Sequence, residues 1–208
     1  MLLRVITCTA LVGTALGDSA ANMMMDRILK DLWTEIEHAG LQPTALSPFN
    51  LRVKASDDTQ KDFKANFTQG SLHGLRLLER HGNCEHGFFR VACYVSLGSL
   101  RAVVNADVEG DLNGEKPHSI SISSKVHQSF LRIKFYGGKG SPAQLIPLTV
   151  GPIDLVSKVE QGKIDIERRR FYDFEEQTER NVARQISSIL SGRFSAVLHT
   201  VASRHLMP

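Results

Sequence analysis

The C-terminal stretch from Asp173 to His205 constrains the fold most, because its apolar residues recur at helical spacing. From residue 182 onward most of the gaps between them are three, four or seven positions, which is typical of one stripe along an α-helix. The stripe consists of Phe174, Val182, Ile186, Ile189, Leu190, Phe194, Val197, Leu198 and Val201. A helix of this length is a rod of roughly 50 Å. Because one side of the rod is apolar, we expect another part of the chain to cover it.

The start of this helix carries a recognisable signal. Asp173, followed three residues later by Glu176, predicts an N-cap with a capping box. Gly192 is the glycine inside the stretch, and it permits a bend without requiring one.

The N-terminus has the pattern of a secretory signal peptide. A short basic segment, Met1 to Arg4, precedes an apolar run, Val5 to Leu16, and Ala15-Leu16-Gly17 is a small-x-small cleavage site. The run is shorter than the ~20 residues that a membrane span needs. We therefore predict a signal peptide at residues 1–17 and one secreted, extracellular domain at 18–208; the alternative is a buried N-terminal helix.

Charge and cysteine content narrow the function classes. The net charge of +3 over 208 residues lacks the broad basic excess of a nucleic-acid binder. After signal cleavage two cysteines remain, Cys84 and Cys93, and in an oxidising compartment they predict one disulfide across a hairpin. Two buried free thiols are the alternative. Asn66 begins an Asn-Phe-Thr sequon, which predicts glycosylation at an exposed position.

Before the middle of the chain, the periodicity predicts a first helix from Met24 to Ala39. Its apolar stripe consists of Ile28, Leu29, Leu32, Trp33 and Ile36, and Gly40 is a suitable C-terminal stop. The connection that follows, residues 42–61, is rich in Pro, Ser and Asp and holds a short predicted strand from Phe49 to Val53.

From about Phe67 to Val156 the apolar period changes to two, which predicts a long antiparallel meander. We expect Leu75 and Leu77 on one strand face, and a hairpin that joins strands 89–97 and 100–107 through Gly98-Ser99. Residues 119–136 predict a further long strand with a bulge and a sharp bend near Phe130. Segments 111–117 and 137–142 are predicted loops. Residues 145–155 predict one or two short strands, and 163–170 a last strand or an extended lead into the long helix.

This layout resembles the mite group 7 allergens and, more distantly, the arthropod takeout and juvenile-hormone-binding proteins. Both groups belong to the lipid-binding superfamily that includes bactericidal/permeability-increasing protein. The local resemblance lies between Gly74 and Asp107: Gly74-Leu75-Arg76-Leu77-Leu78-Glu79-Arg80 before a Gly82-Asn83 turn, then the restart at Gly87-Phe88-Phe89. The Cys84 and Cys93 pair is a departure from these families. The resemblance implies an α+β fold, in which a long curved antiparallel sheet wraps around the C-terminal amphipathic helix and a shorter helix precedes it.

The resemblance also implies an apolar groove between sheet and long helix that holds a lipid or another elongated apolar ligand. Such a site gains about 0.8 kcal/mol for each buried CH₂. Candidate ligand-binding residues on the strands are Leu75, Leu77, Val91, Val95, Leu100, Ala102, Val104, Ile120, Ile122 and Phe135. Those on the helix are Ile186, Ile189, Leu190, Phe194 and Val197.

A run of three arginines, Arg168, Arg169 and Arg170, precedes the long helix. Guanidinium groups pair well with phosphate, so the run is a candidate contact for an anionic headgroup. The alternative is a solvated charge run balanced by nearby carboxylates.

The remaining motifs give little support for chemistry. His81 to His86 is the densest group of potential metal ligands, but a third or fourth zinc ligand is not evident. Ser71 and His73 share a strand face without a nucleophile elbow. We therefore predict no enzyme activity, no metal and no cofactor. The alternative to lipid carriage is an interaction module for a protein, a membrane or a bacterial surface, used in defence or immune modulation.

Overall fold

A computed structural model describes residues 19–56, 61–110 and 117–208 of the chain. The predicted signal peptide and nearly all of the predicted loop at 111–117 lie outside the described residues. No described helix is long and apolar enough to cross a membrane.

Helix α1 (Ser19–His38) opens the fold. At the other end α2 (Arg168–Ile189), a π-helical turn η2 (Leu190–Phe194) and α3 (Ser195–Ala202) form one continuous helix of 35 residues. The predicted N-cap at Asp173 is wrong, because the helix begins five residues earlier. Arginine is a good helix former, and Arg170 is buried against the end of the sheet, so the first turn is held in place.

The strands form two antiparallel sheets. The first, sheet A, has the order β1-β3-β6-β7-β11, with β2 beside the far half of β3. The second, sheet B, has the order β10-β8-β5-β4, with β9 also on β8. The strands are β1 (Thr44–Leu46), β2 (Phe49–Val53), β3 (Phe63–His73), β4 (Glu79–Gly87), β5 (Arg90–Ser96), β6 (Arg101–Glu109), β7 (His118–His127), β8 (Phe130–Tyr136), β9 (Gln144–Leu145), β10 (Thr149–Val150) and β11 (Asp154–Gln161).

Among the described residues the chain passes between the sheets four times, and the first three passages correct or refine a sequence prediction; the fourth leads from β10 to β11. A 3-10 turn, η1 (Leu75–Leu77), joins β3 to β4, so the predicted strand through these residues is wrong. The predicted hairpin at Gly98-Ser99 is also wrong, because β5 lies in sheet B and β6 in sheet A. The bend predicted near Phe130 is a third passage, from β7 to β8, where Gln128 has a φ of 42°.

The first three passages are bound together. The backbone N–H of Leu97 donates to the carbonyl of Ser129 at 2.9 Å, and that of Val126 donates to the carbonyl of Leu100 at 3.0 Å. Ser99 Oγ donates to the carbonyl of Gly74 at 3.2 Å. Gly74 is required here, since its φ is 95° and a Cβ would lie 2.0 Å from the Ser99 carbonyl oxygen.

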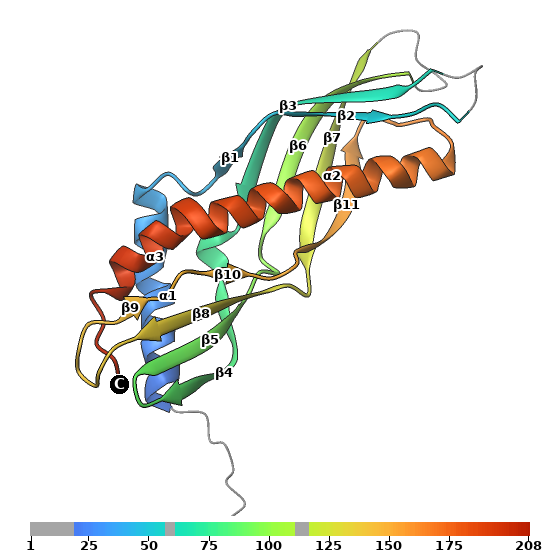
Figure 1. The fold of residues 1–208 in the computed structure, drawn as a ribbon. Coiled ribbons are helices and arrows are strands. Elements are labelled where there is room, and N and C mark those ends of the chain that lie inside the picture. The colour runs from blue at the N-terminus through green and yellow to red at the C-terminus, as the bar shows by residue number, and fades with distance from the viewer. Residues whose placement is uncertain (1–18, 57–60, 111–116) are drawn as a thin grey trace, which may run out of the picture.

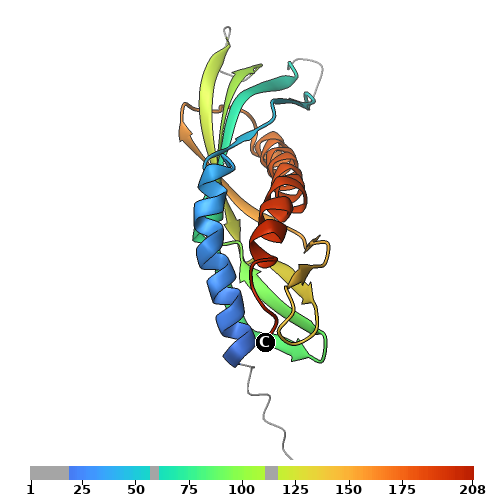
Figure 2. The ribbon, with the colours of Figure 1, turned by 90° about the vertical axis from the view of Figure 1, so that its left-hand side faces the viewer.

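Sheet A curls around the long helix. Strands β2 and β11 lie at opposite edges of the sheet, and both contact α2. Figure 1 shows α2 lying across this sheet, and in Figure 2 α1 and α3 run side by side. The expected α+β fold, with a curved sheet around a long C-terminal helix, is confirmed.

One apolar core fills the space between the two sheets and the helices. Its aromatic centre is Phe174 of α2, which meets Phe63 edge-on and stacks on Phe67 of β3. From α1 the core takes Ile28, Leu32 and Ile36, three of the predicted stripe residues.

Two further sequence predictions concern the first helix. The expected stop at Gly40 is present, because its φ of 62° allows the N–H of Leu41 to reach the Ile36 carbonyl at 2.9 Å. Trp33, however, is 52% exposed rather than part of the buried stripe.

Candidate functional site

The predicted ligand-binding residues converge on the space between the sheets and the long helix, with one exception. Twelve of the fifteen are buried in the core: Leu75, Val91, Val95, Leu100, Ala102, Val104, Ile120, Ile122, Phe135, Ile186, Leu190 and Phe194. Ile189 and Val197 are half-buried at its margin. Leu77 is 51% exposed, since the 3-10 turn directs it away from the core that Leu75 enters.

The inner surface between sheet and helix is largely filled by these side chains. A small cavity of about 30 Å³ lies between α2 and strands β7 and β11, with Ile122, Val159, Phe171 and Phe174 among its lining residues. That volume accommodates about one water molecule. An acyl chain therefore requires α2 to move away from the sheet, and the two edges that hold α2 decide where this is easiest.

The edge formed by β1 and β2 holds α2 tightly. Leu51 and Val53 of β2 are buried. Between β1 and β2, the backbone N–H of Ser47 donates to Gln185 Oε1 at 2.6 Å, and Gln185 Nε2 donates to the Ser47 carbonyl at 3.0 Å. This two-point contact is solvent-exposed, but it fixes both the position and the orientation of the helix.

The β11 edge is looser. Leu155 and Val159 are only half-buried, and Val156 on the outer face is 60% exposed. Here α2 is held by Glu179, whose Oε1 accepts a hydrogen bond from the Ser157 N–H at 3.0 Å. Partial burial raises the pKa of Glu179, an effect that the hydrogen bonds from Ser157 oppose and the nearby Glu175 carboxylate reinforces.

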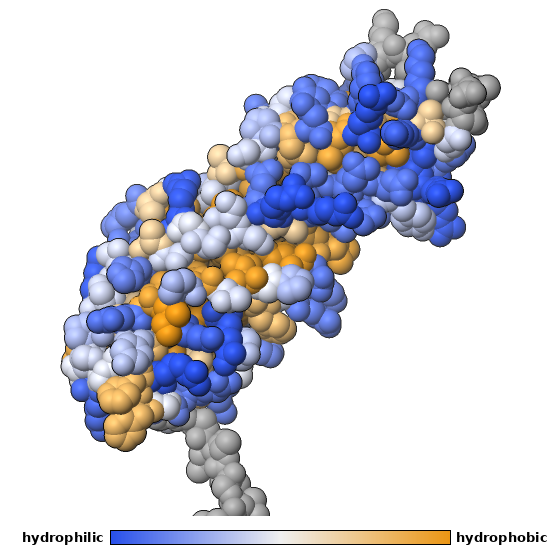
Figure 3. All heavy atoms as spheres, in the orientation of Figure 1, coloured by the Kyte–Doolittle hydropathy of each residue, from blue (hydrophilic) through white to orange (hydrophobic). Residues whose placement is uncertain are grey.

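Apolar surface continues from this edge along the long helix. Figure 3 shows it as orange patches below the helix, over β10 and the neighbouring connection. The half-buried apolar residues in this region are Leu148, Val150, Ile153, Leu155, Ile189 and Val197. We call the surface formed by the Glu179–Ser157 contact and these six residues the β11 seam.

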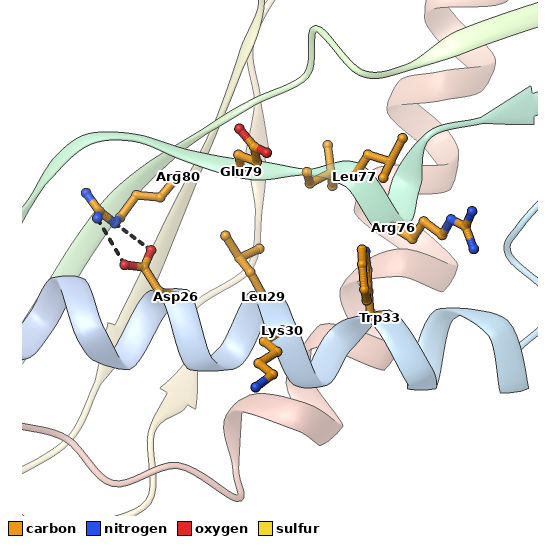
Figure 4. Close-up of a pocket in the computed structure, with 9 residues that line it drawn as sticks. Asp26, Leu29, Lys30, Trp33, Arg76, Leu77, Glu79 and Arg80 are labelled. Atoms are coloured by element: carbon orange, nitrogen blue, oxygen red, sulfur yellow. Dashed lines mark hydrogen bonds and ion pairs between the residues drawn. The ribbon is translucent and has the colours of Figure 1, made fainter.

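A second hollow, which the sequence reasoning missed, lies between α1 and the η1–β4 segment. Its volume is about 370 Å³, within the range of small-molecule pockets. Figure 4 shows Leu29 and Trp33 pointing from α1 toward Leu77, with the Arg80–Asp26 ion pair at one end. The sequence feature that could have predicted this hollow is the apolar stripe of α1, because the stripe is wider than one buried helix face requires.

The three arginines were predicted to precede the long helix, but they form the first turn of α2, and they do not make one exposed patch. Arg170 is buried, and its Nη2 donates to the carbonyl of Lys61 at 2.8 Å. Arg168 is exposed and lies over the ring of Tyr172, whose hydroxyl accepts from Arg168 Nε at 2.9 Å. Arg168 and Arg169 are the members still available to a headgroup.

The cysteines and the sequon lie where the sequence placed them. Cys84 and Cys93 form a disulfide that joins the paired strands β4 and β5, which confirms the predicted bond. Asn66 lies on the exposed face of β3, as a glycosylation acceptor requires.

The polar motifs weighed from the sequence also have definite places. Ser71 Oγ lies 2.9 Å from His73 Nε2 on β3, so they share a face within a strand and not at a strand-to-helix elbow. Within the described ranges, no three His, Cys, Asp or Glu side chains gather closely enough to hold a metal ion.

Comparison with known proteins adds information on the fold. No protein-family profile and no curated protein sequence matches the chain. Among solved structures, lipopolysaccharide-binding protein is similar over 88% of this chain, with a TM-score of 0.57 and 14% identity. The chain shares its fold with that protein. It spans 40% of the other protein's length. Takeout 1 of Epiphyas postvittana also matches, over 85% of this chain and 86% of its own, at 10% identity and a TM-score of 0.33.

Proposed function

We propose that the protein is a secreted, non-enzymatic binder of a lipid or another elongated apolar ligand. In this proposal residues 1–17 are removed as a signal peptide, and the mature chain is of the mite group 7 allergen type. The shared fold with a protein named for binding lipopolysaccharide supports the ligand class. The disulfide supports an oxidising compartment.

The single observation that carries the proposal is that the two edges of sheet A hold α2 unequally: one edge is packed more tightly against the helix than the other. The β1–β2 edge is closed by buried side chains and by Gln185, whereas the β11 edge is closed by half-buried residues and by the Glu179–Ser157 contact. A ligand that enters at the β11 seam separates the fewest buried groups. It then reaches the cavity beside Ile122 and Phe174, where its chain leaves water.

The ligand site of this proposal is therefore the β11 seam and the core beneath it. The half-buried Ile189 and Val197 receive the outer part of the chain. The buried candidates nearest the cavity, led by Ile122, receive its end. The charged groups beside the cavity are Lys158 and Glu175, which suit an amphiphile with its polar end at the surface.

The first experiment is native mass spectrometry of the secreted protein, followed by mass spectrometry of its organic extract. An added mass that disappears on extraction and matches a lipid is the expected result. Saturable uptake of a fluorescent fatty acid by delipidated protein is the second readout. A clean apo mass together with no uptake contradicts the proposal and favours an interaction module with a filled core.

A matched pair of variants locates the site. Val159→Trp fills the cavity, and we expect it to weaken fatty-acid binding by about tenfold, the equivalent of roughly two excluded methylene groups. Val156→Trp makes the same change on the outer face of the same strand and leaves binding unchanged. Equal effects of the two substitutions would place the ligand elsewhere.

A further inference from the structure

The tip of the β4–β5 hairpin presents two phenylalanines to solvent. Phe88 and Phe89 form the turn between Gly87 and Arg90, which are paired across the strands. Phe88 is 91% exposed and Phe89 is 50% exposed. Their ring centroids lie 5.1 Å apart, and Tyr136 of β8, itself 53% exposed, lies 6.2 Å from Phe89. We call these three residues the aromatic tip.

The aromatic tip is unusual for a hairpin turn. Such turns favour Gly, Asn and Asp, which pay little for exposure and adopt the turn conformation readily. Two exposed phenylalanines lose the free energy that their burial would give. In Figure 3 the apolar lobe at the lower left end of the molecule lies over this hairpin, away from the β11 seam.

The aromatic tip is also firmly held. The Cys84–Cys93 disulfide joins the two strands just behind it. The N–H of Gly137 donates to the carbonyl of Phe89 at 3.1 Å, which ties the turn to the end of β8. The rings are therefore presented by a rigid support, and binding through them requires little ordering of the backbone.

The strands and the loop that carry the aromatic tip have a net positive charge. The charged residues of segments 82–92 and 130–140, leaving histidine aside, are Glu85, Arg90, Arg132, Lys134 and Lys139, a net charge of +3 from four cations and one carboxylate. Glu85 is paired with Arg132 at 2.9 Å. Arg90 lies directly opposite Tyr136, and Lys139 is exposed in the loop that follows β8.

We propose that the aromatic tip is a membrane-docking element for a bilayer that contains anionic lipid. Phe88 and Phe89 enter the acyl region, Tyr136 lies at the headgroup level, and Arg90 and Lys139 pair with phosphate. Two projecting rings with Arg90 and Lys139 close by fit a soft anionic surface better than a protein groove, since protein interfaces are depleted in lysine. This goes beyond ligand binding at the β11 seam and does not depend on it.

The test is flotation of the full mature chain with vesicles of two compositions. One is phosphatidylcholine alone, and the other is phosphatidylcholine with phosphatidylserine in a three-to-one ratio. We expect binding to the mixed vesicles that decreases with added salt. The double variant Phe88→Ala with Phe89→Ala is expected to weaken it about a hundredfold, because two inserted rings are lost.

Two control variants separate this surface from general stickiness. Tyr172→Ala removes a side chain that is 51% exposed on α2, and should leave vesicle binding unchanged. Lys139→Glu is expected to weaken binding about tenfold, whereas Lys30→Glu, at another exposed lysine on α1, should have a much smaller effect. Fatty-acid uptake in the absence of vesicles, measured on the Phe88 and Phe89 double variant, should match that of the wild type.

Three outcomes would overturn the proposal: no binding to the mixed vesicles, full binding by the double variant, or equal binding to the two vesicle compositions. A dimer that dissociates on Phe88→Ala, without vesicle binding, would instead assign the aromatic tip to contact with a second copy of the chain. If the wild-type protein binds the mixed vesicles but takes up no fatty acid, the result contradicts the proposed ligand site at the β11 seam and leaves the membrane-docking proposal standing.

Discussion

Glu179 on the long helix accepts a hydrogen bond from the backbone N–H of Ser157 on β11 at 3.0 Å. A carboxylate from the helix thus occupies the hydrogen-bonding edge of the outermost strand of sheet A. It satisfies a strand N–H that would otherwise face solvent. Because Glu179 can be protonated, the strength of this contact depends on pH.

The variant Glu179→Gln tests that dependence. The pKa of Glu179 is raised in the folded chain, chiefly by burial, so the charged form destabilises the fold. The cost is absent at low pH, where the group is protonated in both states, and appears as pH rises from the unfolded to the folded pKa. We expect Glu179→Gln to remove it, with a gain below about 1 kcal/mol at neutral pH because the group is partly solvated.

Thermal unfolding of both proteins from pH 4 to 7 checks this prediction. The difference in Tm should grow with pH and then level off. Glu176→Gln on an exposed part of the same helix is the control; it breaks an ion pair with Arg180, so it should show no gain in Tm at neutral pH. A larger difference at acid pH than at neutral pH would contradict the assignment.

The disulfide should contribute measurably to stability. Closing the short loop between Cys84 and Cys93 is worth about 2.5 kcal/mol in the chain-entropy model. The double variant Cys84→Ala with Cys93→Ala should therefore lower Tm by roughly 5–10 °C. Added reductant should lower the Tm of the wild type by a similar amount and leave that of the variant unchanged.

Gly74→Ala should be severely destabilising, by more than about 3 kcal/mol. The new Cβ would collide with the Ser99 carbonyl, and alanine is strained at the positive φ of this position. Gly82→Ala is the matched control: its φ is 66°, but nothing lies within 4 Å of the added Cβ. It should cost only about 1–2 kcal/mol. Chemical denaturation measures both, and equal costs would show that backbone strain rather than the close approach dominates.

Truncation of Phe174 should both destabilise the core and enlarge the cavity beneath α2. Phe174→Ala is expected to cost about 3–5 kcal/mol. Because the lost ring borders the cavity at Ile122, the folded variant should bind a small apolar dye more tightly than the wild type. Tyr172→Ala, an exposed change two residues away, should alter neither quantity.

The fluorescence of Trp33 can distinguish the cavity beneath α2 from the hollow between α1 and the η1–β4 segment, called the α1 hollow below. Trp33 is the single tryptophan of the chain and lines the α1 hollow, away from the β11 seam. Its fluorescence in the apo protein should be quenched readily by acrylamide, since the ring is 52% exposed. A fatty acid bound at the β11 seam should leave this quenching unchanged. Protection of Trp33 by the ligand would assign the site to the α1 hollow instead.

The sequence predicted the parts of the fold that depend on local periodicity. The stripe of Ile186, Leu190 and Phe194 located the long helix, and the alternation in segments 89–97 and 100–107 located two strands. It could not show that those strands lie in different sheets, because strand pairing is a long-range choice. The change of phase between Leu97 and Leu100, both buried, was the available signal.

For the candidate site, too, the sequence predicted which residues are buried but not how their side chains are arranged. Buried positions were found because burial follows periodicity, whereas Leu77 was misplaced because one 3-10 turn reversed its direction. The extent of filling between sheet and helix depends on how side chains interlock, which the pattern of apolar residues does not encode. The hollow beside Trp33 depends likewise on the placement of α1 against η1.

The three bound passages between the sheets have a consequence for how the molecule can be divided. Three successive pairs of strands, β3 with β4, β5 with β6 and β7 with β8, each contribute one member to either sheet. No single cut in the chain separates sheet A from sheet B, so neither half should be obtainable as an independent fragment. The molecule should gain and lose its structure as one cooperative unit.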